Sequence, residues 1–132
     1  METEQLTYPG SRRIYVPGTL HSQVRVAMRE VDLDDSLFPD GSTEKNAPVR
    51  VYDCSGPWGD PAFHGDSRKG IPTLRAAWIT DRGDTVPEED GARVAADEKA
   101  PPTQRAYALR GIVTPEMEYV AIRENLGRES AF

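Results

Sequence analysis

The sequence predicts a small α+β domain in which a short antiparallel sheet packs against two main helices and long loops connect them. Three stretches alternate apolar with polar residues, as half-buried strands do. Two others space their apolar residues at the helical period and begin with helix-start residues. The chain has 132 residues, of which 37% are hydrophobic, with 11 Gly and 11 Pro. One domain with a modest core and long loops is therefore expected.

The three strands are expected at about residues 13–16, 24–33 and 49–53. The first ends at the turn pair Pro17-Gly18. In the second, the apolar alternation changes phase between Met28 and Val31, which predicts a bulge or a twist. The second and third strands are expected to pair antiparallel, and the loop between them turns at the segment Pro39-Asp-Gly-Ser42.

The two helices are expected at about residues 72–82 and 115–126. Pro72 is a favoured first helical residue, and Gly83 is a typical helix stop. Three residues favour the start of the second helix. Thr114 offers a side-chain cap, Pro115 has a suitable φ, and Glu116 adds a negative charge at the helix N-terminus. Apolar residues lie on two neighbouring faces of this helix, with Tyr119, Ile122 and Leu126 on one of them. That pattern predicts a helix that is buried more than halfway round or that meets a partner.

The remaining segments are expected to be irregular. Residues 1–12 are predicted to form a flexible N-terminus, and residues 13–132 a single domain. The stretch from Cys54 to Gly70 is too rich in Gly and Pro to continue a strand. Residues 84–103 contain no aromatic residue and only two Val as larger aliphatic residues, so a disordered insertion is predicted there.

The charge balance excludes several classes of function. The chain has 22 acidic and 16 basic residues and a net charge of −6, which argues against binding to nucleic acid or to an anionic membrane surface. No apolar run reaches the length of a membrane span, and the start lacks the layout of a signal peptide. A cytoplasmic protein is therefore expected. A single cysteine, Cys54, forms no internal disulfide and no cysteine-based metal cluster.

Two catalytic arrangements have weak support in the sequence. Asp60, His64 and Asp66 lie within seven residues and would be the ligands of a metal-dependent hydrolase, but a solvated loop is favoured. Cys54 or Ser55 with a histidine base would be a nucleophilic site, yet no Gly-x-Ser-x-Gly turn is present. Cys54 is more simply a small buried side chain at a strand end.

An anion site is the third candidate, in the loop before the first helix. The segment Ser67-Arg-Lys-Gly70 precedes Pro72, and the free N–H groups of a helix start favour an anion. No phosphate-binding glycine motif occurs, so Arg68 and Lys69 are expected to pair with nearby carboxylates or with a neighbouring subunit. The aromatic residues of this region are expected to pack the loop onto the first helix: Trp58, Phe63 and Trp78. Interface or anion contacts are thus assigned to Trp58, Asp60, Arg68 and Lys69, and no catalytic, cofactor-binding or metal-binding residue is expected.

Several segments, taken in their order along the chain, form a recognisable series. The most specific is the fifteen-residue run from Gly111 to Asn125. The others are Ser11–Val16, Val26–Glu30, Val49–Asp53 with Ser55–Pro57 and Asp60-Pro61, Arg68–Pro72, Leu74-Arg75, Trp78-Ile79 and Arg82–Asp84. Together they resemble the N-terminal domain of the phosphomethylpyrimidine synthase (ThiC) family of thiamin biosynthesis, and the resemblance covers about residues 11–128.

The resemblance implies a role within a larger enzyme. Such synthases convert aminoimidazole ribotide to hydroxymethylpyrimidine phosphate by radical chemistry, with S-adenosylmethionine and a [4Fe–4S] cluster. The substrate lies in a later barrel, and the cluster is held by three cysteines near the C-terminus. The chain stops at Phe132, before both, so it is expected to be a cut segment: an accessory domain, inactive by itself, that packs on the barrel and iron–sulfur domain and helps form a homodimer. The alternative is a stand-alone binding or assembly protein that keeps the domain without the enzyme.

Overall fold

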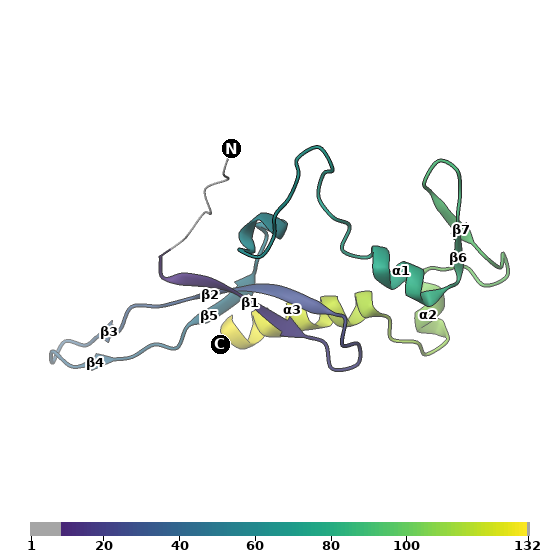
Figure 1. Ribbon diagram of the computed structural model, residues 1–132. Coiled ribbons are helices and arrows are strands. Elements are labelled where there is room, and N and C mark those ends of the chain that lie inside the picture. Colours follow the sequence, from purple (N-terminus) through teal and green to yellow (C-terminus); the bar gives the residue numbers. More distant parts are fainter. Residues whose placement is uncertain (1–8, 132) are drawn as a thin grey trace.

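The computed structural model describes residues 9–131, with side chains for residues 9–126. A three-stranded antiparallel sheet has α3 on one face, while a long hairpin and a second small hairpin extend to opposite ends of the molecule (Figure 1). This confirms the predicted α+β class. None of the helices in the described part of the chain is long and apolar enough to cross a bilayer.

The main sheet is a meander of β1 (Ser11–Pro17), β2 (Arg25–Val31) and β5 (Val49–Tyr52), in the order β1-β2-β5. The three predicted strands and the antiparallel pairing of the second with the third are confirmed. The first strand starts two residues earlier than predicted, so residues 11 and 12 belong to the sheet. Residues 1–8 of the predicted flexible terminus lie outside the described residues.

The predicted bulge in the second strand is wrong. Pairing with β1 is continuous from Pro17↔Arg25 to Ser11↔Val31. The hydrophobic phase changes because Glu30 takes a position on the core face at the end of the sheet. Arg12 and Arg50 lie directly opposite Glu30 on the two neighbouring strands, and both form ion pairs with it. Two cations thus allow a carboxylate where an apolar residue is expected.

The connection from β2 to β5 is an extended arm rather than a featureless loop. Two-residue strands, β3 (Ser36–Leu37) and β4 (Thr43–Glu44), pair antiparallel within it. The predicted turn at residues 39–42 is confirmed by hydrogen bonds from the Phe38 N–H to the Ser42 carbonyl and from the Gly41 N–H to the Phe38 carbonyl.

The core lies between the sheet and α3 (Pro115–Ala131). Val24, Val26, Met28 and Trp78 are buried there, and partly buried residues of α3 pack against them: Tyr119, Ile122 and Leu126. The Tyr119 ring lies 5.9 Å from the Trp78 ring, and its hydroxyl is 2.8 Å from that of Tyr52. Burial and the hydrogen bond with Tyr52 raise the pKa of Tyr119, so the Tyr119 hydroxyl stays neutral in this hydrogen bond.

The start of α3 is confirmed and its end is not. The Thr114 hydroxyl accepts a hydrogen bond from the Met117 N–H at 3.2 Å, as a cap does. The helix continues through Gly127 to Ala131 instead of ending near residue 126, because glycine inside a helix costs only about 1 kcal/mol. The second apolar face is exposed, with Val120 at 54%.

The first predicted helix is shorter than expected. The helix α1 covers Ala76–Arg82 and ends, as predicted, at Gly83, which has a φ of 69°. The predicted start at Pro72 is wrong. Ile71 and Leu74 remain 62% and 55% exposed, so a helical turn there would bury no apolar surface to offset its ordering. A further helix, α2 (Gln104–Leu109), and the 3-10 turn η1 (Gly56–Gly59) were not predicted.

A hairpin lies within residues 84–103, where composition alone predicts no regular structure. Its strands are β6 (Thr85–Pro87) and β7 (Arg93–Ala95). Nearly all of its residues are exposed, so little apolar burial stabilises the pairing. The prediction of a disordered insertion in solution therefore stays a prediction.

Amide hydrogen exchange tests that prediction directly. We expect the amides of β6 and β7 to exchange orders of magnitude faster than those of β2, because exposed backbone hydrogen bonds open at little free-energy cost. Mass spectrometry of the intact chain, digested after labelling, resolves the two regions. Equal protection in β2 and in the hairpin would contradict a disordered insertion.

Candidate functional site

A polar cluster lies on the face of the sheet opposite α3, where the loop after β5 folds back over β1. Arg13 and Tyr15 point from β1 to this face, because strand residues alternate and Ile14 and Val16 point to the core. Asp53, Ser55 and Asp60 come from the loop. The main-chain N–H of Asp53 continues the sheet with a 3.1 Å bond to the Ala27 carbonyl.

Arg13 and Asp53 form the centre of this cluster. The Nε of Arg13 donates to Oδ2 of Asp53 at 3.0 Å, and the two side chains are only 6% and 4% exposed. The other oxygen of Asp53, Oδ1, accepts from the N–H of Ser55 at 2.9 Å and from its hydroxyl at 2.6 Å. The second amine of Arg13 donates to the Ser55 hydroxyl and to the Gly56 carbonyl, at 3.1 and 2.5 Å.

These contacts keep the Asp53 carboxylate ionised. Burial alone raises the pKa of Asp53, but the hydrogen bonds from Arg13 and Ser55 outweigh it and lower the pKa to about 2. A carboxylate with that pKa and with both oxygens occupied is not a general base near neutral pH. The cluster therefore fixes the loop on the sheet rather than transferring protons.

Tyr15 and Asp60 extend the cluster along the loop. The hydroxyl of Tyr15 donates to Oδ2 of Asp60, while Oδ1 of Asp60 accepts from the Ala62 N–H at 2.8 Å. The guanidinium of Arg25 lies 4.1 Å from the centre of the Tyr15 ring, in a cation–π contact. The hydrogen bond from Tyr15 lowers the pKa of Asp60, so this carboxylate is also engaged in holding the loop.

Gly59 is required where the loop meets the cluster. A Cβ at this position would lie 2.1 Å from the hydroxyl oxygen of Ser55 and 3.2 Å from the second amine of Arg13. Only glycine therefore allows the turn η1 to approach the ion pair so closely.

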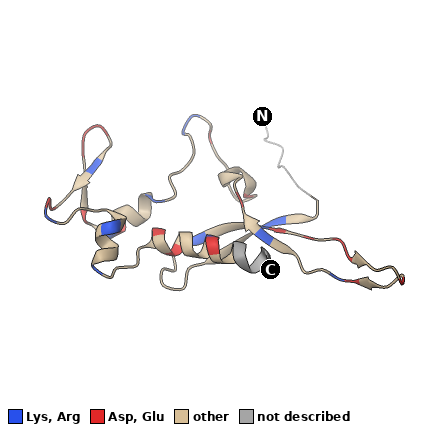
Figure 2. Ribbon diagram, turned by 180° about the vertical axis from the view of Figure 1, so that it is seen from behind, with Lys and Arg blue, Asp and Glu red and all other residues tan. Residues whose placement is uncertain are grey.

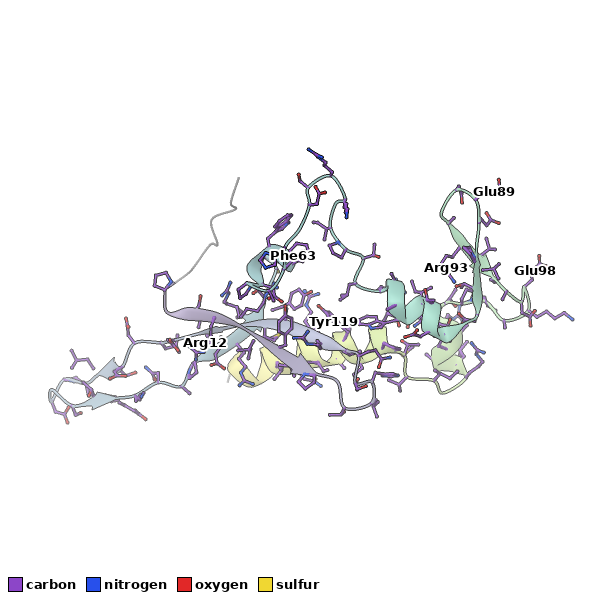
Figure 3. All side chains as sticks on the ribbon, in the orientation of Figure 1. Arg12, Phe63, Glu89, Arg93, Glu98 and Tyr119 are labelled. Atoms are coloured by element: carbon purple, nitrogen blue, oxygen red, sulfur yellow. The ribbon has the colours of Figure 1, made fainter. Side chains whose placement is uncertain are left out.

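The residues proposed from the sequence are not brought together into one site. Asp60 belongs to the polar cluster, whereas Trp58 is 43% exposed and packs edge-to-face on Phe63, with 5.3 Å between ring centres. Arg68 and Lys69 are exposed, in the turn between Asp66 and Gly70. The α3 helix and the loop carrying Phe63 lie on opposite sides of the sheet (Figure 3). The assignment of these four residues to an interface or anion contact stays a prediction.

Several expectations about this loop are wrong. Trp58 and Phe63 pack on each other and Trp78 belongs to the core, so the three aromatic residues do not join the loop to α1. Cys54 is exposed, because Asp53 points to the cluster and the next side chain must point away from it. The helix begins at Ala76, so Ser67–Gly70 does not precede a helix N-terminus.

The three residues considered as metal ligands form no metal site. In the part of the chain that the structure describes, no group of three or more His, Cys, Asp or Glu side chains is placed to hold an ion. Asp60 binds Tyr15, and Oδ1 of Asp66 accepts from the Arg68 N–H at 2.9 Å. The arrangement therefore gives no support to a metal-dependent hydrolase.

Reasoning from the sequence missed the residues that form the cluster. Arg13, Tyr15 and Asp53 were not proposed as site residues, and Ser55 was considered only as a nucleophile, although all four lie in segments that carry the family resemblance. A signal was available in the strand pattern, because Arg13 and Tyr15 occupy the polar positions of the first strand. Their partners, however, are 40 and 45 residues away and depend on the path of the loop.

A second group of ion pairs joins α1 to the start of α3. Glu116 accepts two hydrogen bonds from Arg82, at 2.7 and 2.8 Å, and two from Arg75, at 3.2 Å. Burial opposes ionisation of Glu116, but these bonds lower its pKa to about 2. Arg82 also lies over the ring of Tyr107, which anchors α2. Both polar groups thus connect elements instead of lining a catalytic cleft.

The fold and these clusters define a small α+β domain that ion pairs hold together across its elements. A model of the ThiC-associated domain matches residues 7–86 of the sequence. The chain belongs to the ThiC-associated domain family, which links it to ThiC and to thiamin biosynthesis. The matched residues include both β1 and the loop that carry the polar cluster.

Proposed function

We propose that this chain is the N-terminal accessory domain of a cytoplasmic phosphomethylpyrimidine synthase and that it docks on the catalytic barrel and contributes to the homodimer. The membership of the ThiC-associated family supports the assignment to that enzyme. The synthase converts aminoimidazole ribotide to hydroxymethylpyrimidine phosphate, as the resemblance implies. The domain contributes no reacting group and is inactive by itself.

The observation that carries this proposal is the amount of apolar surface left exposed. Among the described residues, fourteen large hydrophobic residues are exposed and five hydrophobic residues are buried. The accessible surface is 10206 Å², against roughly 6,900 Å² for a compact monomer of this mass. A domain of this kind gains stability by covering part of that surface with a partner.

The side of the molecule formed by α2 and α3 is the face we assign to the barrel. Large apolar residues are exposed from the end of α2 to the second turn of α3: Leu109 at 77%, Ile112 at 44%, Val113 at 49% and Val120 at 54%. They follow one another within twelve residues, and exposed apolar residues of this kind are what a protein interface buries.

The chain's own residues do not fit the iron–sulfur cluster of the synthase. Such clusters take three or four cysteine ligands, and this sequence has one cysteine, Cys54. The cluster and S-adenosylmethionine therefore belong to the rest of the enzyme in this proposal.

A reconstitution experiment tests the proposed function. The purified chain is mixed with a synthase from which the corresponding N-terminal domain has been removed, and the mixture is analysed by size-exclusion chromatography and assayed for the pyrimidine phosphate. We expect a complex, a gain in activity, and no turnover by the chain alone. Leu109→Asp should weaken the complex by about tenfold or more, whereas Leu37→Asp, at an equally exposed leucine outside the face, should not. Absence of any complex would favour the stand-alone binding or assembly protein.

A further inference from the structure

The connection between β2 and β5 is an ordered hairpin that projects from the sheet and is rich in acidic residues. Residues 32–48, called the arm here, contain five carboxylates and one lysine. Figure 2 shows its acidic residues spread along a hairpin that extends away from the sheet. Asn46 bridges its two legs with hydrogen bonds of 2.6 Å to the Asp34 carbonyl and 3.0 Å to the Ser36 hydroxyl. The arm is thus held in shape by its own bonds.

The end of the arm presents apolar side chains to solvent. Leu37 is 75% exposed and Phe38 is 42% exposed, beside the turn at residues 39–42. In the part of the chain that the structure describes, Asp34, Asp35 and Glu44 form no ion pair with a cation. The arm therefore carries two exposed apolar residues together with three carboxylates that have no cationic partner among the described residues.

An apolar groove bordered by arginine lies at the end of the molecule opposite to the arm (Figure 1). It has a volume of about 510 Å³ and mostly apolar walls, formed by Leu74, Ala76 and Ile79 with Arg75 and Arg93 at the rim. Arg93 lies in the second hairpin, near α1 (Figure 3). Its guanidinium donates only to Thr85, at 2.8 and 3.1 Å, and within the described ranges no carboxylate lies within ion-pair distance of it. The groove thus combines an apolar wall with a cation that lacks an anionic partner.

We propose that the arm of one chain inserts Leu37 and Phe38 into this groove of a second copy and that the reciprocal contact forms a two-fold dimer. This deepens the proposed function, on which it rests, by assigning a surface to the homodimer contact. Apolar residues meet apolar walls, and the acidic residues beside them meet Arg93, whose guanidinium pairs with no carboxylate in the described part of the chain. The arm and the groove of one chain lie at opposite ends (Figure 1). Two molecules placed side by side in opposite directions therefore satisfy both contacts, and the assembly closes.

Paired variants of the full chain, studied by analytical ultracentrifugation, test this dimer. We expect the unmodified chain to dimerise, and Leu37→Asp in the arm or Leu74→Asp in the groove to weaken the dimer by about tenfold or more. Both positions are exposed, at 75% and 55%, so the variants should fold, which circular dichroism verifies. Leu109→Asp is the matched control, at a leucine that is 77% exposed and outside both surfaces. It should leave the dimer unchanged.

Mixing the two variants gives the sharpest result. Neither the arm variant nor the groove variant alone retains an intact contact, but a mixed dimer joins the native arm of one to the native groove of the other. The mixture should therefore associate more strongly than either variant by itself. In a Cys54→Ser chain, Ser36→Cys with Thr80→Cys should also form a disulfide between chains under oxidation. A monomeric chain without such a disulfide, or a dimer that both aspartate variants leave intact, would overturn the proposal.

The failure of this proposal can be told apart from the failure of the proposed function. Loss of barrel binding with an intact arm-to-groove dimer would reject the accessory role and keep the dimer contact. Barrel binding by a chain that forms no such dimer would keep the accessory role and reject the contact. Leu37→Asp and Leu109→Asp separate these outcomes, because each changes only one of the two surfaces.

Discussion

Replacing Asp53 by alanine is expected to lower the free energy of unfolding by about 3–5 kcal/mol, because it leaves the buried guanidinium of Arg13 without its carboxylate. The side chains of this pair are 6% and 4% exposed, so water does not replace the lost contact. Unfolding in urea, followed by tryptophan fluorescence, measures the change. A loss of this size is a large part of the stability of a small domain.

The matched control for Asp53 is Asp32→Ala. Asp32 also pairs with an arginine, Arg12 at 3.2 Å, but both side chains are about half exposed. An exposed pair of this kind contributes less than about 1 kcal/mol. Equal losses for the two variants would show that the Arg13–Asp53 pair does not hold the loop. Replacing both Arg13 and Asp53 by apolar residues should restore part of the stability, since the guanidinium of Arg13 is then no longer buried without its carboxylate.

The paired carboxylates of Asp53 and Glu116 make the stability of the domain sensitive to acid. The pKa of Asp53 falls from 3.8 to about 2 and that of Glu116 from 4.5 to about 2 on folding. Each therefore contributes on the order of 2–3 kcal/mol of stability above its unfolded pKa, and this is lost as the pH falls from about 5 toward 2. The Asp53→Ala chain should lose less stability than the unmodified chain over this range. A parallel decline would contradict the assignment.

Replacing Gly18 by alanine is expected to cost roughly 2–3 kcal/mol, because the turn between β1 and β2 is packed against α3 at this residue. A Cβ on Gly18 would lie 2.1 Å from Oε1 of Glu118 and 2.4 Å from the carbonyl oxygen of His21. The first atom belongs to a side chain, but the second is main chain, so the turn itself must shift.

That shift removes the bonds by which α3 holds the turn. Glu118 is 6% exposed, and its carboxylate accepts hydrogen bonds from the N–H groups of Leu20 and His21 at 2.8 and 2.9 Å. Burial disfavours its charge, but these two N–H groups lower the pKa of Glu118. Displacing the turn leaves donors and acceptor unpaired in a buried place, which costs more than the net value of the bonds.

Thermal unfolding of single and double variants tests this contact. Thr19→Ala, in the same turn but exposed, should change the unfolding free energy by less than about 0.5 kcal/mol. Gly18→Ala combined with Glu118→Ala should cost less than the sum of the two single changes, because removing the carboxylate relieves part of the clash. Additive losses would show that Gly18 and Glu118 do not act on each other.

Local chemistry allowed much of the fold to be predicted from the sequence. The alternation of Val24, Val26 and Met28 gave the central strand, and the segment Pro39–Ser42 gave the turn of the arm. Thr114 and Pro115 gave the start of α3, and Gly83 gave the end of α1. Each of these signals acts within a few residues, since caps, turns and strand alternation are properties of neighbouring residues.

Contacts between distant residues decided the rest. Arg13 meets Asp53 across 40 positions and Leu20 meets Glu118 across 98, and no local pattern indicates either pair. The helix α1 starts at Ala76 and not at the predicted Pro72, because packing buries Trp78 and leaves Leu74 exposed to solvent. The sequence by itself therefore determined the three strands of the main sheet, the turn of the arm, the start of α3 and the end of α1, because neighbouring residues set these. Only the tertiary structure decided which charges are buried together and which apolar residues stay exposed, because register and packing bring distant residues into contact.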